Sequence, residues 1–251
     1  MNFIRSVLFN IAFYVVTAVI LVASLPFFFI LPQGFGMWVV RTWARISVWL
    51  HVWIAGVRIE VRGRENIPQS GALIAAKHQS AFETFALIPL LKNPTIVMKR
   101  SIRWLPIFGQ YTVRTGMIHV DREGKTSALR DLAARARTEL DKGREIIMFP
   151  EGTRRAPGAK PEYQPGIALL YRTLNVPVVP VALNSGLFWP RRQFVHRPGT
   201  IVVEFLPAIP PGLDSRTFLN RLQGAIETAS EALAAEGRAE LSAAHGAAPA
   251  T

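Results

Sequence analysis

An uncharged run near the start of the chain constrains its fold more than any other feature. Between Ser6 and Val40 there is no charged residue, and residues 7–31 are almost wholly apolar. A helix of that length can cross the hydrocarbon core of a bilayer, which is about 30 Å thick. The apolar region of a cleavable signal peptide is shorter, about 7–15 residues, so we do not expect this run to be one. Prolines and glycines near its end predict a helix kink or a hairpin turn there: Pro26, Pro32, Gly34 and Gly36.

Residues 37–57 predict a second helix beside the first. Tryptophans in this stretch supply the amphipathic rings found at bilayer interfaces, and Arg41 and Arg45 share one helical face. We expect this helix to lie in or near the interface; the alternative is a second, buried helix of the globular domain. Basic residues cluster after the apolar run, while Arg5 stands nearly alone before it. This bias predicts that the rest of the chain lies on the cytoplasmic side.

Composition narrows the classes of partner. The chain of 251 residues is 50% hydrophobic, with a mean hydropathy of +0.23, and carries a net charge of +12. Together these values predict an anionic partner and a membrane surface. Nucleic acid suits the charge but not the apolar start of the chain, so we expect no nucleic-acid partner. The absence of cysteine excludes disulfides and a cysteine acyl-enzyme, and the five scattered histidines form no ligand pair, so we expect no metal.

After Gly63 short apolar runs alternate with polar, helical stretches. Runs rich in valine and isoleucine predict strands buried on both faces: residues 58–61, 72–76, 95–98, 117–120, 145–149, 178–183 and 201–206. Helices are expected between them: residues 82–91, 126–142, 166–174 and 215–234. The alternation predicts an α/β fold with a mostly parallel central sheet flanked by helices, whose active residues gather at the carboxyl ends of strands.

These patterns divide the chain into three regions. Residues 1–57 are expected to form a membrane-associated segment of two helices that anchors the chain. Residues 58–234 are expected to form the α/β domain, in a chain whose length suits one sizeable core. Residues 235–251 are predicted to be an alanine-rich tail whose last eight or so residues are disordered. Within the sheet, Pro177 and Pro180 favour an edge strand or a bulge over residues 178–183.

His78 and Glu83 are the strongest candidates for chemistry. A neutral imidazole can take a proton from an alcohol that attacks a thioester, although a histidine at a strand end can also be purely structural. Glu83 has two interpretations as well, because Ser80 and Glu83 have the spacing of a capping box at a helix start. On one continuous helix the two side chains would diverge by about 140°, so they meet only if His78 lies in the loop before it. Glu83 could then orient His78 and stabilise its imidazolium.

Four sequence blocks, in this order, resemble the membrane glycerolipid acyltransferases, whose prototype is 1-acylglycerol-3-phosphate acyltransferase. The blocks are residues 77–84, 116–122, 149–154 and 176–181, and the resemblance covers roughly residues 63–206. The chain departs from the family's usual first block at Glu83, where the usual residue is aspartate, one methylene shorter.

The resemblance implies an acyltransferase and assigns roles to its residues. His78 and Glu83 would be the catalytic pair. The second and third blocks would bind the phosphate and glycerol of the acceptor through five residues: Arg122, Glu151, Gly152, Thr153 and Arg154. Arginine suits phosphate because its guanidinium can form two parallel hydrogen bonds with it.

The implied reaction moves a fatty acyl group from acyl-CoA or an acylated acyl carrier protein (acyl-ACP) to the free hydroxyl of 1-acylglycerol-3-phosphate. The product is phosphatidic acid, and no other cofactor is expected. The expected partners are the lipid bilayer, the lysophospholipid acceptor and the acyl thioester donor, at an active site on the cytoplasmic face of the membrane. Two alternatives stay open: the same chemistry on another lysolipid such as lyso-ornithine lipid, or a non-catalytic protein that binds the membrane surface. The alternative of a non-catalytic protein leaves the His78–Glu83 pair unexplained.

Overall fold

The computed structural model describes residues 1–28, 30–69, 71–121 and 125–246. Within this part of the chain, one seven-stranded sheet has the order β1-β7-β6-β2-β5-β3-β4. Neighbouring strands are parallel, except that β6 and β7 are antiparallel. The strands are β1 (Val57–Arg62), β2 (Leu73–Ala76), β3 (Pro94–Lys99), β4 (Ile118–Val120), β5 (Glu145–Met148), β6 (Val178–Leu183) and β7 (Gly199–Phe205).

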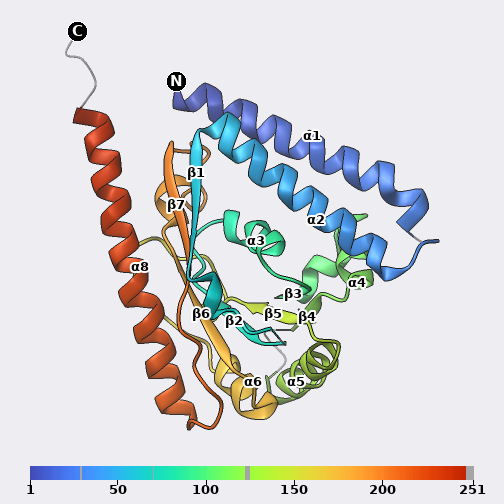
Figure 1. Cartoon of the computed structure of the whole chain (residues 1–251). Helices are drawn as coiled ribbons and strands as arrows, with labels where there is room; N and C mark the ends of the chain where they lie inside the picture. Colours follow the sequence, from blue (N-terminus) through green and yellow to red (C-terminus); the bar gives the residue numbers. More distant parts are fainter. Residues whose placement is uncertain (29, 70, 122–124, 247–251) are drawn as a thin grey trace.

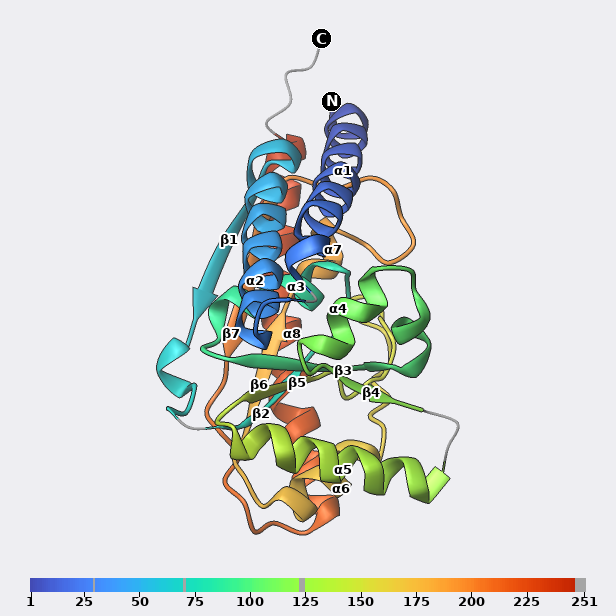
Figure 2. The same cartoon turned by 90° about the vertical axis from the view of Figure 1, so that its right-hand side faces the viewer.

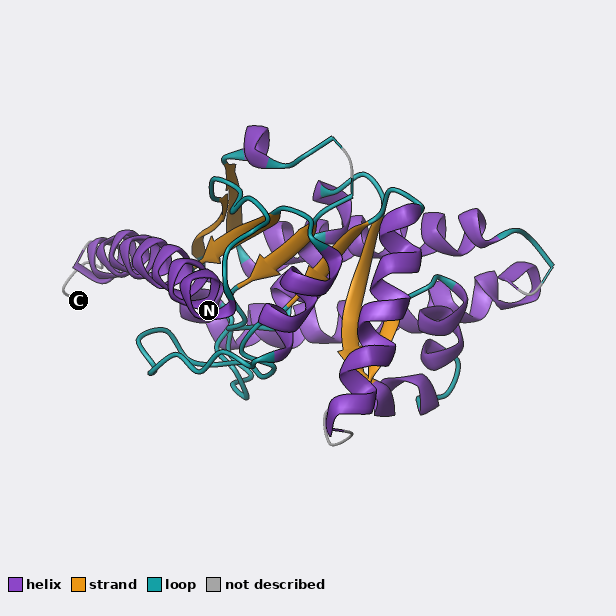
Figure 3. Ribbon diagram, turned by 90° about the horizontal axis from the view of Figure 1, so that it is seen from below, coloured by secondary structure: helices purple, strands orange, loops and turns teal. Residues whose placement is uncertain are grey.

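Helices cover both faces of the sheet, which makes three layers (Figures 1 and 3). On one face α5 (Lys125–Asp141), α6 (Gly166–Leu174) and α8 (Ser215–Gly246) pack against strand residues such as Leu73 and Ala75. On the other face α2 (Gln33–Leu50) and α3 (Phe82–Ala86) pack against the intervening residues, such as Ile74 and Ala76. Because both faces are covered, all four residues of β2 are buried. The expected α/β class with a mostly parallel sheet is confirmed.

Shorter helical segments connect these elements. They are η1 (His51–Ala55), η2 (Arg64–Asn66), η3 (Ile88–Leu90), η4 (Arg100–Trp104), α4 (Phe108–Arg114) and α7 (Ser185–Phe188). The helix expected over residues 82–91 is wrong in its extent, since α3 ends at Ala86 and the chain continues into η3. Pro89 explains the break, because it lacks the N–H that a continuing α-helix would need.

Two helices form the N-terminal segment, as expected. α1 (Asn2–Phe28) and α2 run side by side as an antiparallel hairpin on one side of the domain (Figures 1 and 2). Among the described helices, α1 is the one that is long and apolar enough to cross a membrane, judged by length and composition. α2 lies between α1 and the sheet and contributes Met37 and Ala44 to the core, while Trp49 and Trp53 stay exposed. The second helix thus belongs in part to the globular core.

The C-terminal helix is longer than the sequence predicted. We expected it to end at residue 234, but α8 continues to Gly246. Two glutamates hold the turns that follow residue 234. Glu236 forms an ion pair with Arg62 at 3.0 Å, and the carboxylate of Glu240 accepts the N–H of Thr200 at 2.9 Å. The alanines expected to form a tail instead extend a helix, which alanine favours. Residues 247–251 lie outside the described residues.

The prediction of an edge strand at β6 is wrong, whereas the alternative of a bulge agrees with the pairing beside Pro180, which shifts by one residue: Val181 lies opposite Phe205, but Val178 lies opposite Ile209. β6 lies inside the sheet, between β7 and β2. The carbonyl of Pro180 accepts the N–H of Leu206 at 2.9 Å, on the side that faces β7. The register of β6 with β7 begins only at Val181. The nitrogen of Pro180 is on the β7 side of β6, before the regular pairing with β7 begins. The missing N–H of Pro180 therefore costs the sheet no hydrogen bond.

Candidate active site

The carboxyl ends of β2 and β5 bring the first and third sequence blocks together. The two strands are parallel neighbours, with Ala75 opposite Met148, so the residues that follow them emerge at one edge. His78 follows β2 and Phe149 follows β5, and their rings stack with centroids 4.2 Å apart. The N–H of Arg155 donates to the carbonyl of His78 at 2.8 Å, which ties the two loops together.

His78 lies in the loop before α3, where it meets Glu83. Its Nδ1 is 2.9 Å from Oε1 of Glu83, whose side chain is fully buried. The same oxygen accepts the N–H groups of Gln79 and Ser80, each at 2.6 Å. An ionised carboxylate only accepts hydrogen bonds, so Nδ1 carries the proton and Nε2 is the basic nitrogen of the neutral ring. The Glu83 side chain therefore makes both of its predicted contacts, one to the backbone at the start of α3 and one to the imidazole of His78.

Two contacts from a distant part of the chain brace this pair. Ser185 Oγ donates to Oε2 of Glu83 at 2.8 Å, and Gln79 Oε1 accepts the N–H of Gly186 at 3.0 Å. Ser185 and Gly186 begin α7, directly after β6, so a third strand end contributes to the site. Sequence analysis missed both residues, because more than a hundred positions separate them from their partners and no short pattern connects them.

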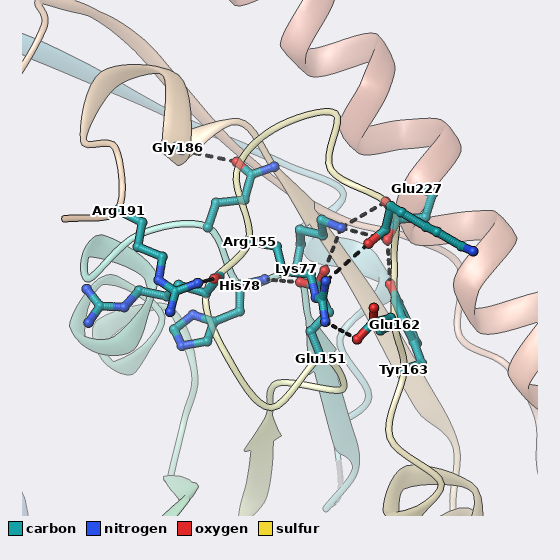
Figure 4. A network of polar contacts seen from close by, with 12 residues as sticks. Lys77, His78, Glu151, Arg155, Glu162, Tyr163, Gly186, Arg191 and Glu227 are labelled. Carbon is teal, nitrogen blue, oxygen red and sulfur yellow. Dashed lines mark hydrogen bonds and ion pairs between the residues drawn. The ribbon is translucent and has the colours of Figure 1, made fainter. Parts of the chain in front are cut away.

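Glu151 is buried beside the site and bonds to the protein itself. Its Oε1 accepts from Nζ of Lys77 at 2.9 Å, and its Oε2 accepts the N–H of His78 at 3.1 Å (Figure 4). The amine of Lys77 also contacts both carboxylate oxygens of Glu227 on α8, at 2.8 Å each. The resemblance implied that Glu151 binds the acceptor. These two bonds make the carboxylate part of the scaffold of the His78 loop, and its implied contact with the acceptor stays a prediction.

An apolar cavity of about 290 Å³ adjoins His78. The Nε2 atom of His78 has no hydrogen-bond partner within the described part of the chain, and 14% of the side chain is exposed. The walls come from both N-terminal helices and from the region between β3 and β4: they include Thr17, Ile20, Leu21, Val39, Val40, Trp43, Ile96, Ile102 and Tyr111. The imidazole of His78 therefore lines a space suited to a hydrocarbon chain.

A second cavity, of about 450 Å³, shares Phe149 with the first. Glu151, Gly152 and Thr153 line it. Gly152 has a φ of +67°, in the left-handed region that glycine adopts without strain, and this allows the tight turn after β5. This turn places Glu151, Gly152 and Thr153 along an open space next to the His78 loop, and their predicted contacts with an acceptor stay predictions.

Of the two arginines predicted to bind phosphate, the structure describes Arg154. The carbonyl of Arg154 accepts a hydrogen bond from Nη1 of Arg191 at 2.6 Å, which fixes the backbone of the turn. Arg122 lies outside the described residues, although the preceding Asp121 lines the second cavity. The roles of both arginines therefore stay predictions.

The buried histidines away from this site contact one another. His51 Nε2 is 3.1 Å from His196 Nδ1, and both rings are packed among aromatic side chains such as Phe9 and Trp189. Burial lowers the pKa of His51 to about 3 and that of His196 to about 4. Within the described residues, no group of three histidine, aspartate or glutamate side chains is placed to hold a metal ion.

Comparison with known proteins adds to this geometry. The family model called Acyltransferase matches residues 58–184, just over half of the chain. A protein of Pseudomonas aeruginosa named 1-acyl-sn-glycerol-3-phosphate acyltransferase is 39% identical over 171 residues, which are 68% of this chain and 66% of that protein. A protein of Limnanthes alba with the same name is 31% identical over 162 residues, 64% of this chain and 57% of its own length. The chain thus matches between 57% and 66% of the length of these relatives.

One solved structure has a similar fold. The 1-acyl-sn-glycerophosphate acyltransferase PlsC from Thermotoga maritima superposes with a TM-score of 0.75 and covers 93% of this chain and 98% of its own. Its sequence is 21% identical. At that identity the match establishes a common architecture, which extends over the N-terminal hairpin as well as the α/β domain.

Proposed function

Because the chain belongs to the acyltransferase family, we propose that it moves a fatty acyl group from a thioester to the free hydroxyl of 1-acylglycerol-3-phosphate. The product is phosphatidic acid. The names of the Pseudomonas and Limnanthes relatives support this acceptor. The observation that carries the proposal is the His78–Glu83 pair, whose Nδ1 and Oε1 are 2.9 Å apart and whose histidine lines an apolar cavity.

In the proposed reaction, Nε2 of His78 takes the proton of the acceptor hydroxyl as its oxygen attacks the thioester carbonyl. A carbon–oxygen bond forms, the carbon–sulfur bond breaks, and the imidazolium returns the proton to the leaving sulfur. Glu83 holds the ring in the required tautomer and stabilises the imidazolium, as the acid of a Ser-His-Asp triad does. The acyl group passes directly between substrates, in keeping with a chain that has no cysteine to form a thioester.

The two cavities suggest where the substrates lie. We assign an acyl chain to the apolar cavity, because α1 and α2 form part of its wall and would place it against lipid. The glycerol phosphate would lie at the third block, on Gly152, Thr153 and Arg154, with Arg122 as a second cation. Arginine at both positions fits phosphate because each guanidinium can donate two parallel hydrogen bonds.

The membrane attachment follows from α1. Its outer face is apolar and exposed along the helix, including Ile4, Ile11, Val15 and Val22. Its inner face is bound to the domain near both ends, since Ser6 Oγ accepts the N–H of His196 at 2.8 Å and Tyr111 donates to the carbonyl of Leu21 at 3.1 Å. A helix fixed in this way cannot cross the bilayer without carrying the domain in with it. We therefore propose that α1 lies in the plane of one leaflet.

We place the active site on the cytoplasmic face. Acidic lipids give the cytoplasmic leaflet a negative surface potential, which attracts a chain of net charge +12. Labelling of an engineered cysteine near the site, in closed and in opened cells, tests this assignment. Labelling in closed cells by an impermeant reagent would contradict it.

The activity is tested with a panel of substrates. The full-length protein in vesicles is given a labelled acyl chain on coenzyme A or on acyl carrier protein, with 1-acylglycerol-3-phosphate, a lysophospholipid with a larger head group, or lyso-ornithine lipid. The proposal predicts that labelled phosphatidic acid is the fastest product formed. Faster acylation of lyso-ornithine lipid would change the acceptor, and no transfer to any lysolipid would leave the protein as a membrane-surface binder.

A further inference from the structure

Lys77, the residue before His78, lies in a buried network that reaches the C-terminal helix. Its side chain is 3% exposed, and its amine contacts one oxygen of Glu151 and both oxygens of Glu227 (Figure 4). A lysine ammonium has three donors, so this environment uses them all. Tyr163 donates its hydroxyl to Glu227 at 3.0 Å, and burial together with Glu227 raises the pKa of this tyrosine, which keeps the donor protonated.

The Lys77 and His78 side chains point to different sides of the loop. The N–H of Lys77 donates to the carbonyl of Val181 at 2.9 Å and so continues the pairing of β2 with β6. Successive side chains of an extended strand alternate between its faces. Figure 4 shows the amine directed toward Glu227 and the imidazole directed away from it. Lys77 therefore acts on the site through Glu151, whose second oxygen accepts the N–H of His78 at 3.1 Å.

We propose that Lys77 is a positioning residue: together with Glu227 it fixes the Glu151 carboxylate, which in turn fixes the backbone of the general base His78. This inference rests on the proposed function. It makes α8 part of the catalytic scaffold, because Glu227 ties this helix to the carboxyl end of β2. Buried charges require partners, so loss of the amine would release Glu151 as well. A displacement of about 1 Å in a catalytic group can lower the rate about a hundredfold.

The decisive variant is the double change Lys77→Met/Glu227→Gln. The wild-type cluster has one cation and two carboxylates, and the double variant keeps the single carboxylate of Glu151, so both have a net charge of −1. The double variant therefore removes only the contacts that Lys77 makes with Glu151 and Glu227. We expect kcat per folded molecule to fall about a hundredfold, with little change in KM for either substrate and none in the pH profile. Hydrogen exchange at the His78 amide should become faster, because its acceptor is no longer fixed.

Two further variants separate positioning from charge and from stability. Glu227→Gln alone keeps a carbonyl that can accept from Lys77, so kcat should fall much less than in the double variant. Because the cluster loses one negative charge, the acid limb of kcat/KM should move about half a pH unit lower. The matched control is Arg144→Met/Glu139→Gln, at the amino end of β5, where an equally buried cation pairs with a glutamate at 2.6 Å. This control should lower the unfolding temperature and leave kcat per folded molecule unchanged.

The outcomes distinguish this inference from the proposed function. If the wild-type protein acylates no lysolipid, the proposed function fails, and hydrogen exchange still reports whether Lys77 holds the His78 loop. If the wild type is active, a double variant with wild-type kcat and unchanged exchange would overturn the positioning role. Should the double variant not fold, Glu227→Leu removes two of the three contacts of Lys77 and should lower kcat about tenfold. A wild-type kcat in that variant would overturn the role equally.

Discussion

Replacing Glu83 with glutamine removes a charge from the active site and keeps most of its hydrogen bonds. The backbone N–H groups of Gln79 and Ser80 both point at Oε1, so the amide oxygen of the new side chain must take that position. The same oxygen can still accept from Nδ1 of His78. The amide NH₂ then faces Ser185, whose hydroxyl can turn to accept. The imidazole thus keeps its tautomer, and the main loss is the negative charge beside it.

The size of the effect follows from this geometry. Nδ1 and Oε1 are 2.9 Å apart, which places the charge centres of imidazolium and carboxylate about 4 Å apart. At an effective dielectric constant of about 20, such a pair is worth about 4 kcal/mol. Because about 1.4 kcal/mol corresponds to a tenfold change in rate, turnover should fall about a thousandfold. The backbone hydrogen bonds become neutral ones, so the free energy of unfolding should fall by only about 2 kcal/mol.

The assay is steady-state acyl transfer, normalised to the folded fraction, with the unfolding temperature measured in parallel. Ser185→Ala is the matched control, since it removes a hydrogen bond from the same carboxylate and keeps the charge. That variant should lose about 1 kcal/mol, which is less than tenfold in turnover. A folded Glu83→Gln protein with turnover near that of the wild type would reduce Glu83 to a helix cap and refute the pairing argument.

Arg154→Ala should lower kcat/KM for the phosphate-bearing acceptor by the equivalent of about 2–4 kcal/mol, and should lower it less for a monoacylglycerol. An equal fall in kcat/KM for the two acceptors would indicate a structural role for Arg154. The full chain should sediment with membranes and resist extraction by high salt, because the attachment is mainly hydrophobic, whereas release by salt alone would show that charge holds it. The lowered pKa values of His51 and His196 mean that both are neutral when folded and gain protons on unfolding below pH 6.5. Stability should therefore fall on acidification, by about 2 kcal/mol per histidine between pH 6.5 and 5. An unfolding temperature that is constant over this range would contradict that expectation.

Local patterns predicted the parts of the structure that depend on local physics. The run at residues 72–76 identified β2 because a strand covered on both faces has no polar side to interrupt it. The capping signal at Ser80 and Glu83 placed His78 in the loop before α3, and the geometry agrees. Both inferences used residues within a few positions of one another.

Long-range partners could not be predicted in this way. Ser185 reaches Glu83, and Glu227 reaches Lys77, only because the sheet order places β6 and α8 beside β2. The bonds of Glu151 to Lys77 and His78 could not be predicted for the same reason, since both donors come from the end of a different strand. The end of α8 was misplaced because its alanine-rich end was taken for a tail, although alanine favours helix and Glu236 and Glu240 contact β1 and β7 there.

The central claim is that His78 takes the proton from the acceptor hydroxyl. It is tested most directly by a single-turnover experiment, with enzyme in excess over labelled acyl thioester and with 1-acylglycerol-3-phosphate saturating. The wild type should form labelled phosphatidic acid with no labelled protein at any time, and its rate should fall as His78 becomes protonated at acid pH. His78→Ala, shown to be folded, should form product no faster than the uncatalysed reaction. Phosphatidic acid formed by that variant at a rate near that of the wild type, or an acyl group attached to the protein before product appears, would contradict the account.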